Sequence, residues 1–142
     1  MKMLKKAASV ALASALVFSL AACGSKDGGD SGSSSSGGDV FMIGGIGPTT
    51  GDNAIYGNAV KNGVQLAVDE INADGGINGY QIEYKFEDDQ SDSEKAVNAY
   101  NTLKDWGMQM LIGTVTSTPC TAVVEESHAD NMFQLTPSAT AV

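Results

Sequence analysis

The side chains best suited to chemistry in this sequence are hydroxyls that follow apolar runs. Ser117 and Thr118 come shortly after the apolar residues 110–112, and Pro119, a residue favoured in the first helical position, follows them. The start of a helix offers free N–H groups and the positive end of the helix dipole, so it attracts a carboxylate. Two interpretations stay open from position alone: Ser117 contacts a bound anion, or Ser117 or Thr118 only caps the helix.

A second hydroxyl-rich segment, residues 136–140, contains Ser138 and Thr140 and follows the mostly apolar residues 132–135. Open parallel sheets bind ligands beyond the carboxyl ends of their strands. If the runs before these two segments are parallel strands, both segments lie at the edge where a ligand binds. The same rule selects residues 47–53 and 88–91, so we expect a small-molecule site built from these four loops.

The residue sets of common enzyme classes are missing. The single histidine, His128, falls near a predicted helix end, where a surface or packing role is expected, and no GxSxG, Walker loop or Cys/His cluster occurs. Residues 45–50 read GIGPTT, without the third glycine of a dinucleotide-binding loop. The acidic residues 88–92 lack the glycine of an EF-hand, so a solvated turn is expected there. We predict no catalytic residue, no metal site and no cofactor.

The elements that would position these loops alternate from residue 40 onward. Hydrophobic patterning and turn residues predict four strands, at 40–46, 80–87, 110–112 and 132–135. Three helices are predicted between them, at 54–72, from Asp92 or Ser93 to 106, and from Pro119 to about Asp130. Short connections in the order β-α-β-α-β-α-β require right-handed crossovers. The sequence therefore predicts an α/β fold with a parallel, doubly wound sheet.

One face of each of the first two helices is expected to be buried. Apolar residues at i, i+4, i+7 and i+8 spacing mark that face of an amphipathic helix. In the helix at 54–72 these residues are Val60, Val64, Ala67, Val68 and Ile71, and in the next helix they are Ala96, Val97, Tyr100 and Leu103.

The N-terminal residues 1–22 have the build of a secretory signal peptide. Lysines precede an apolar run, and the run ends at residues 20–23 with the sequence LAAC. This ending resembles the bacterial lipobox, so Cys23 is expected to carry lipid and anchor the protein to a membrane. A buried N-terminal helix, or ordinary cleavage with Cys23 incidental, are the alternatives.

Residues 23–39 are expected to form a lipidated, flexible linker, because Gly, Ser and Asp cannot bury apolar surface. From Cys23 onward the chain carries all 17 acidic residues but only five of the eight lysines, a formal charge of −12. Nucleic-acid binding relies on basic surface to neutralise phosphates, so no nucleic-acid partner is predicted.

The predicted sheet looks incomplete, because nothing follows the strand at 132–135 to cover it. We therefore expect residues 40–142 to be part of a domain and the chain to be truncated. Cys120 has no partner here if Cys23 carries lipid, and pairing with a cysteine beyond residue 142 stays open. A small packed thiol is the preferred interpretation.

Three phrases carry a resemblance to a known family. They are IGPTTG at 46–51, AVDEINADGGI at 67–77 and TPSAT at 136–140. In this order and spacing the chain from Val40 to Val142 resembles the leucine/isoleucine/valine-binding family of ABC-transporter solute-binding proteins. The resemblance implies the two-lobed, type I periplasmic-binding-protein fold, of which residues 40–142 would form part of lobe one.

The resemblance also implies roles for four residues. Ser117 would bind a ligand carboxylate through its hydroxyl and backbone N–H, and Ser138 would offer its backbone carbonyl to the ammonium group. Thr140 would bind the amino-acid head group, and Tyr56 would line the side-chain pocket. Some members have a disulfide where this chain has Ser91 and Thr116, so that bridge is missing here.

The predicted function is extracytoplasmic capture of a branched-chain amino acid, without chemistry, for delivery to the transmembrane permease of an ABC importer. The protein is expected to be a lipid-anchored monomer. The alternatives are the same fold binding an amide, urea or another amino acid, or serving as a ligand sensor. A dinucleotide-binding enzyme is the remote alternative.

Overall fold

The computed structural model describes residues 40–140, and the predicted signal peptide, lipidated Cys23 and linker lie outside this range. The predicted element order is confirmed. The strands are β1 (Val40–Gly47), β2 (Gln81–Asp88), β3 (Met110–Gly113) and β4 (Gln134–Leu135). The helices are α2 (Ala54–Ala73), α3 (Ser93–Trp106) and α4 (Ser117–Ala129).

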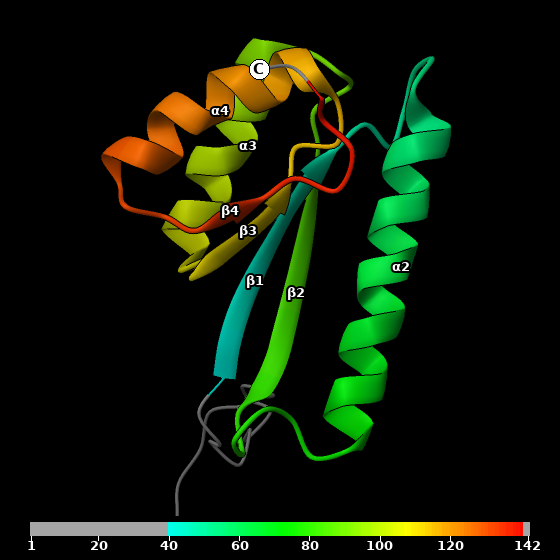
Figure 1. The fold of residues 1–142 in the computed structure, drawn as a ribbon, viewed down its shortest axis with the longest axis vertical. Helices are drawn as coiled ribbons and strands as arrows, with labels where there is room; N and C mark the ends of the chain where they lie inside the picture. Colours follow the sequence, from blue (N-terminus) through cyan, green and yellow to red (C-terminus); the bar gives the residue numbers. More distant parts are fainter. Residues whose placement is uncertain (1–39, 141–142) are drawn as a thin grey trace, which may run out of the picture. The chain divides into compact units, whose positions relative to one another are not determined.

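The four strands form one parallel sheet in the order β2-β1-β3-β4 (Figure 1). Strand β1 pairs with β2 along its whole length, from Val40 opposite Gln81 to Gly47 opposite Asp88. The pairing on the other side of β1 is shorter and runs from Ile43 opposite Met110 to Ile46 opposite Gly113. Strand β4 contributes only two paired residues to the outer edge of β3. The predicted parallel α/β class is therefore confirmed.

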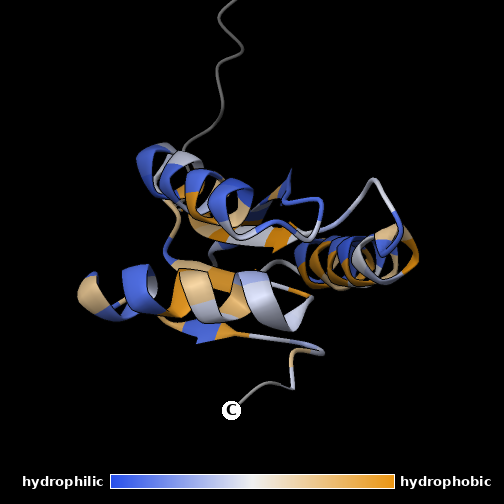
Figure 2. Cartoon of the chain, turned by 90° about the horizontal axis from the view of Figure 1, so that it is seen from above, coloured by the Kyte–Doolittle hydropathy of each residue, from blue (hydrophilic) through white to orange (hydrophobic). Residues whose placement is uncertain are grey.

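Alternation along β1 divides the core into two clusters on opposite sheet faces. Ile46 faces α3 and α4 and packs with Tyr100, Leu103, Leu111 and other buried residues. Ile43 faces the side of α2, where it packs with Val68 and Ile82. Figure 2 shows apolar residues where the helices meet the sheet. Since successive strand side chains point to opposite faces, both faces of the sheet are covered by helices, as in doubly wound folds.

Helix α2 buries less of its apolar face than the sequence pattern predicts. Of the five predicted residues only Val68 is buried, whereas Val60, Val64 and Ile71 are half-buried and Ala67 is exposed. The physical reason is that the contacts of α2 with the sheet are mainly to two strands, β1 and β2. Helix α3 follows its prediction more closely, because Ala96, Tyr100 and Leu103 are buried and Val97 packs at the edge of the same cluster.

The ends of α3 match their predicted residues, whereas the start of α4 does not. Asp92 caps α3, with its Oδ1 accepting the Lys95 N–H at 2.9 Å, and Gly107 ends the helix in the left-handed conformation at φ 101°. Pro119 was expected as the first residue of the next helix, but α4 begins at Ser117 after Thr116, so the proline is the third helical residue. A missing N–H is tolerated anywhere in the first turn, which explains the difference.

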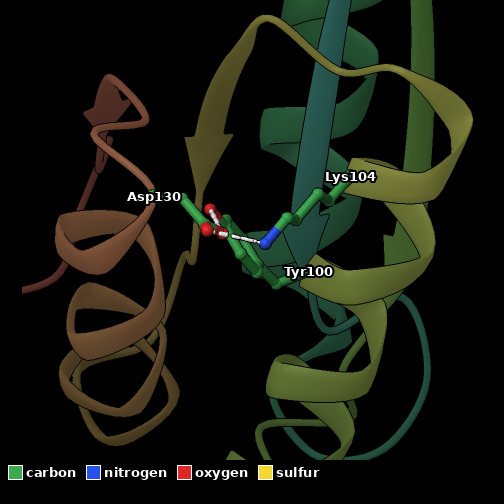
Figure 3. Close-up of polar contacts among 3 residues, drawn as sticks. All are labelled: Tyr100, Lys104 and Asp130. Atoms are coloured by element: carbon green, nitrogen blue, oxygen red, sulfur yellow. Dashed lines mark hydrogen bonds and ion pairs between the residues drawn. The ribbon is translucent and has the colours of Figure 1, made fainter.

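A small polar cluster joins α3 to the end of α4 (Figure 3). Lys104 Nζ lies 2.6 Å from both carboxylate oxygens of Asp130, and the Tyr100 hydroxyl donates to Asp130 Oδ2 at 2.9 Å. Hydrogen bonds from Lys104 and Tyr100 lower the pKa of Asp130, and burial followed by the bond to Asp130 raises that of Tyr100. The cluster fixes the end of α4 and thereby the start of the segment that leads to β4.

Within residues 40–140 no helix is both long and apolar enough to cross a membrane.

Candidate functional site

The sheet order places the ends of β1 and β3 at a topological switch point. Strand β1 is followed by α2 on one face of the sheet, and β3 is followed by α4 on the other. Because their connections leave in opposite directions, a crevice opens between the loops that follow the two strands. The hydroxyl-rich segment after β4 lies beside the β3 loop, since β4 pairs with β3.

A hollow of about 270 Å³ lies at this edge of the sheet. Three of the four predicted ligand-binding residues line it, together with residues of the loops after β1 and β3. The complete lining is Asn53, Tyr56, Val115, Thr116, Ser117 and Ser138. The fourth predicted residue, Thr140, is not part of the lining, but its backbone N–H donates to Ser117 Oγ at 3.1 Å. The structure therefore brings all four residues to one place.

Ser117 lies in the first turn of α4 and does not cap it. Thr116 occupies the N-cap position and makes no side-chain capping hydrogen bond. The Ser117 hydroxyl instead accepts the Thr140 N–H, and among the described residues no group accepts the hydroxyl proton. Of the two interpretations left open by the sequence, capping by Ser117 or Thr118 is wrong. A hydroxyl with a free proton beside a helix N-terminus suits an anionic acceptor.

The loop after β4 is held by its own hydroxyls. The Thr136 hydroxyl donates to the Thr114 carbonyl at 2.8 Å, and the Ser138 hydroxyl donates to the Val115 carbonyl at 2.6 Å. Sequence reasoning gave Ser138 only a backbone role and gave Thr136 none. The signal that was missed is Pro137: proline has no N–H, so regular strand pairing cannot continue past it.

The loop after β1 positions Tyr56, which is 61% exposed at the start of α2. Gly57 lies so close to this loop that a Cβ atom there would stand 1.8 Å from the Pro48 carbonyl oxygen. Asn58 Nδ2 donates to the Thr49 carbonyl at 3.1 Å. The first turn of α2 is thus fastened to the loop, and Tyr56 is fastened with it.

The acidic turn after β2 supports the same loop. Asp88 accepts the Thr49 N–H at 2.8 Å and the Thr50 hydroxyl at 2.6 Å. Burial alone would raise the pKa of Asp88, but the hydrogen bonds from Thr50, Thr49 and Gln90 outweigh it and lower the pKa to about 2. Asn53, in the lining of the hollow, donates to Ser91 Oγ at 3.0 Å.

The expectation that residues 88–92 form a solvated turn is wrong for Asp89, which is 0% exposed. Its Oδ1 accepts the Ser91 N–H at 2.9 Å, and its Oδ2 has no hydrogen-bond partner among the described residues. Burial, reinforced by the neighbouring charges of Asp88 and Asp92, raises the pKa of Asp89 to about 6. The turn is therefore packed at Asp89, whereas Gln90 and Asp92 are exposed.

These contacts also bear on the remote alternative of a dinucleotide-binding loop. In such a loop the backbone N–H groups after the first strand bind a pyrophosphate. Here the N–H of Thr49 and the hydroxyl of Thr50 are already bound to the carboxylate of Asp88. A carboxylate thus already occupies these two donors, which disfavours a phosphate at that position.

The remaining candidate groups are possible metal ligands, Cys120 and His128. Between residues 40 and 140 no three His, Cys, Asp or Glu side chains gather as a metal site. Cys120 is buried in α4, and its Sγ accepts from Gln134 Nε2 at 3.6 Å, as expected for a packed thiol. His128 lies exposed in the last turn of α4.

Comparison with known proteins supports the resemblance found in the sequence. The chain is 40% identical over 101 residues to the Leu/Ile/Val-binding protein BraC3 of Rhizobium johnstonii, a match that covers 71% of this chain and 28% of that protein. It is 36% identical over 103 residues to a leucine-, isoleucine-, valine-, threonine-, and alanine-binding protein of Pseudomonas aeruginosa, covering 72% of this chain and 28% of that one.

Among solved structures, the chain is similar to the branched-chain amino acid transporter substrate binding protein LivJ of Streptococcus pneumoniae in complex with isoleucine. The TM-score is 0.69 at 36% sequence identity, over 72% of this chain and 30% of that one. The chain thus spans less than a third of the length of these relatives. Residues 41–141 match the family described as periplasmic binding protein, and the chain belongs to that family.

Proposed function

We propose that this chain is part of an extracytoplasmic solute-binding lipoprotein that binds a branched-chain amino acid for an ABC importer. The observation that carries the proposal is the hydroxyl of Ser117, which lines the hollow at the N-terminus of the 13-residue helix α4 and donates its proton to no group of residues 40–140. The names of the relatives, and the isoleucine in the streptococcal structure, favour an amino acid as the anion.

Each group of an α-amino acid has a counterpart at this edge. The ligand carboxylate accepts from the Ser117 hydroxyl and from N–H groups of the first turn of α4. The ammonium group meets the backbone carbonyl of Ser138, Thr140 binds the same head group, and Tyr56 packs against the side chain. A second lobe adds an acid for the ammonium group and aromatic residues that determine side-chain specificity.

The proposed protein acts by binding and closure, without a catalytic step. Two lobes close over the ligand in a hinge motion, and the ligand favours the closed state because it contacts both lobes there. The closed monomer then docks on the transmembrane subunits of the permease.

We place the protein outside the cytoplasmic membrane, anchored by lipid on Cys23. Support comes from the LAAC sequence at 20–23, which ends an apolar run after three lysines. Two or more acyl chains give stable attachment where one does not.

Calorimetry on the full-length protein tests the ligand and the site together. The panel contains leucine, isoleucine and valine, with an amide and urea as competing ligand classes. Ser117→Ala removes a hydroxyl that bonds a charged group, so affinity for the best amino acid is expected to fall by roughly ten- to a hundred-fold. Thr118→Ala is the matched control, because Thr118 lies in the same turn and outside the lining of the hollow.

Three results would contradict parts of the proposal. Equal affinity of Ser117→Ala and the parent would show that the head-group site is elsewhere. Tighter binding of the amide or urea than of any amino acid would show that the site binds another class of ligand. Normal amino-acid uptake in cells that lack the protein, with loss of a response to the amino acid, would favour the sensor alternative.

A further inference from the structure

Resting on the proposed function, we propose that Thr136 is a positioning residue for the ligand head group. Thr136 is not among the residues that line the hollow. Its hydroxyl holds the segment that carries Ser138 and Thr140 against the exit of β3. The hydroxyl thereby sets where that segment meets Ser117.

The hydroxyl of Thr136 forms two hydrogen bonds. It donates to the Thr114 carbonyl oxygen at 2.8 Å and accepts the backbone N–H of Ala139 at 3.1 Å. A hydroxyl has one proton to donate and lone pairs to accept with, so both bonds form together. One side chain thus ties the β3 exit to the middle of the loop that follows β4.

These bonds matter because the backbone offers little else to hold the loop. Strand β4 pairs only at Gln134 and Leu135, and Pro137 has no N–H with which to continue the pairing. Past Leu135 the described contacts to the β3 exit come from side chains: Thr136 to the Thr114 carbonyl, and Ser138 to the Val115 carbonyl at 2.6 Å. The hydroxyls of Thr136 and Ser138 therefore take the place of backbone pairing here. We call these two hydrogen bonds to the β3 exit the hydroxyl ladder.

The segment held by the hydroxyl ladder ends at the proposed head-group site. Thr140 donates its N–H to Ser117 Oγ, and this bond directs the free proton of Ser117 away from Thr140. Loosening the loop at Thr136 displaces Thr140 and removes that constraint. The carboxylate and ammonium contacts then weaken together, whichever side chain the ligand carries.

The test compares two substitutions of Thr136 in the full-length protein. Thr136→Val keeps the shape of the side chain and loses both hydrogen bonds, so binding of leucine, isoleucine and valine is expected to weaken by a common factor of about ten. The ratios among the three affinities stay unchanged, because the side-chain pocket is untouched. Thr136→Ser keeps the hydroxyl and restores binding to within about two-fold of the parent.

Thr102→Val is the matched control. The Thr102 hydroxyl also donates to a backbone carbonyl, that of Asn98 at 2.9 Å, but in α3 and away from the hollow. We expect parental affinities for this variant. The melting temperature without ligand is measured for each variant, because a purely structural role lowers that temperature and leaves affinity unchanged.

Outcomes separate this inference from the proposed function. A parent protein that binds none of the three amino acids overturns both. A parent that binds them, with Thr136→Val binding equally well or with altered ratios among ligands, overturns the inference alone. If Thr136→Val does not fold, Thr136→Ala decides: it removes the same hydroxyl without placing a methyl group there, and unchanged affinity in that variant overturns the inference.

Discussion

Asp88 and Asp89 are neighbours in the chain, yet their carboxyl groups occupy opposite environments at the end of β2. Asp88 accepts hydrogen bonds from the loop after β1, and its pKa falls to about 2. Asp89 is buried with one oxygen unpartnered among the described residues, and its pKa rises to about 6. Asp88 fastens the loop that leads to Tyr56, and Asp89 is expected to make the stability of the turn beneath it depend on pH.

Asp89→Asn is expected to stabilise the protein at neutral pH. The folded state holds the Asp89 proton up to about pH 6 and the unfolded state releases it near 3.8, so parental stability falls as pH rises through that window. The variant has no carboxyl group at this position, so its stability does not fall in this way. Urea unfolding measures the free energy of unfolding at pH 4 and pH 7. We expect the variant to be more stable than the parent at pH 7 and to differ little from it at pH 4. The exposed Asp105→Asn is the control, and an equal gain at both pH values would contradict the explanation.

Asp88→Asn is expected to have the opposite effect. A pKa lowered from 3.8 to about 2 means that ionised Asp88 contributes stability above pH 4, and this contribution is lost as pH falls towards 2. The side chain is partly exposed to solvent, so we expect a loss of only about 1 kcal/mol at pH 7. Parent and variant should converge in unfolding experiments below pH 3, and a constant difference would argue against an ionic contribution.

Much of this fold could be predicted from local signals. The alternation from Ile82 to Phe86, the cap at Asp92 and the glycine stop at Gly107 are each decided by a few neighbouring residues. The strand order β2-β1-β3-β4 could not be predicted in the same way, because pairing between distant segments depends on tertiary packing.

The candidate site could likewise be predicted only where it depends on local features. Position after a strand and before a helix marked Ser117 and Thr118 as candidates, since the helix terminus is a local feature, but it did not decide between capping and ligand contact. The burial of Asp89 and the bond from Thr136 to Thr114 depend on which strands lie side by side, which the sequence pattern does not contain. The family resemblance supplied Ser138 and Thr140 without the hydroxyl ladder that holds them.

Cys23→Ala is expected to release the protein from membranes. The thiol is the group that carries lipid in the proposed anchor, so its loss blocks lipidation and the processing that depends on it. Membrane fractionation and mass spectrometry of the mature N-terminus measure the outcome. Cys120→Ala is the control, because that thiol is buried in α4 and has no role in anchoring. An unmodified mature N-terminus at another residue would refute the anchor.

Gly57→Ala is expected to damage both stability and the site, whereas Gly63→Ala in the same helix is not. A Cβ at Gly57 would stand 1.8 Å from the Pro48 carbonyl oxygen, a backbone atom, but at Gly63 it would meet nothing within 4 Å. Overpacking of this kind costs about 1–3 kcal/mol, and alanine in an open helix position gains about 0.5–1 kcal/mol over glycine. Urea unfolding measures both changes. Because Tyr56 precedes Gly57 in the first turn of α2, ligand affinity should fall only in Gly57→Ala. Equal stability of the two variants would show that α2 does not need its close approach to the loop.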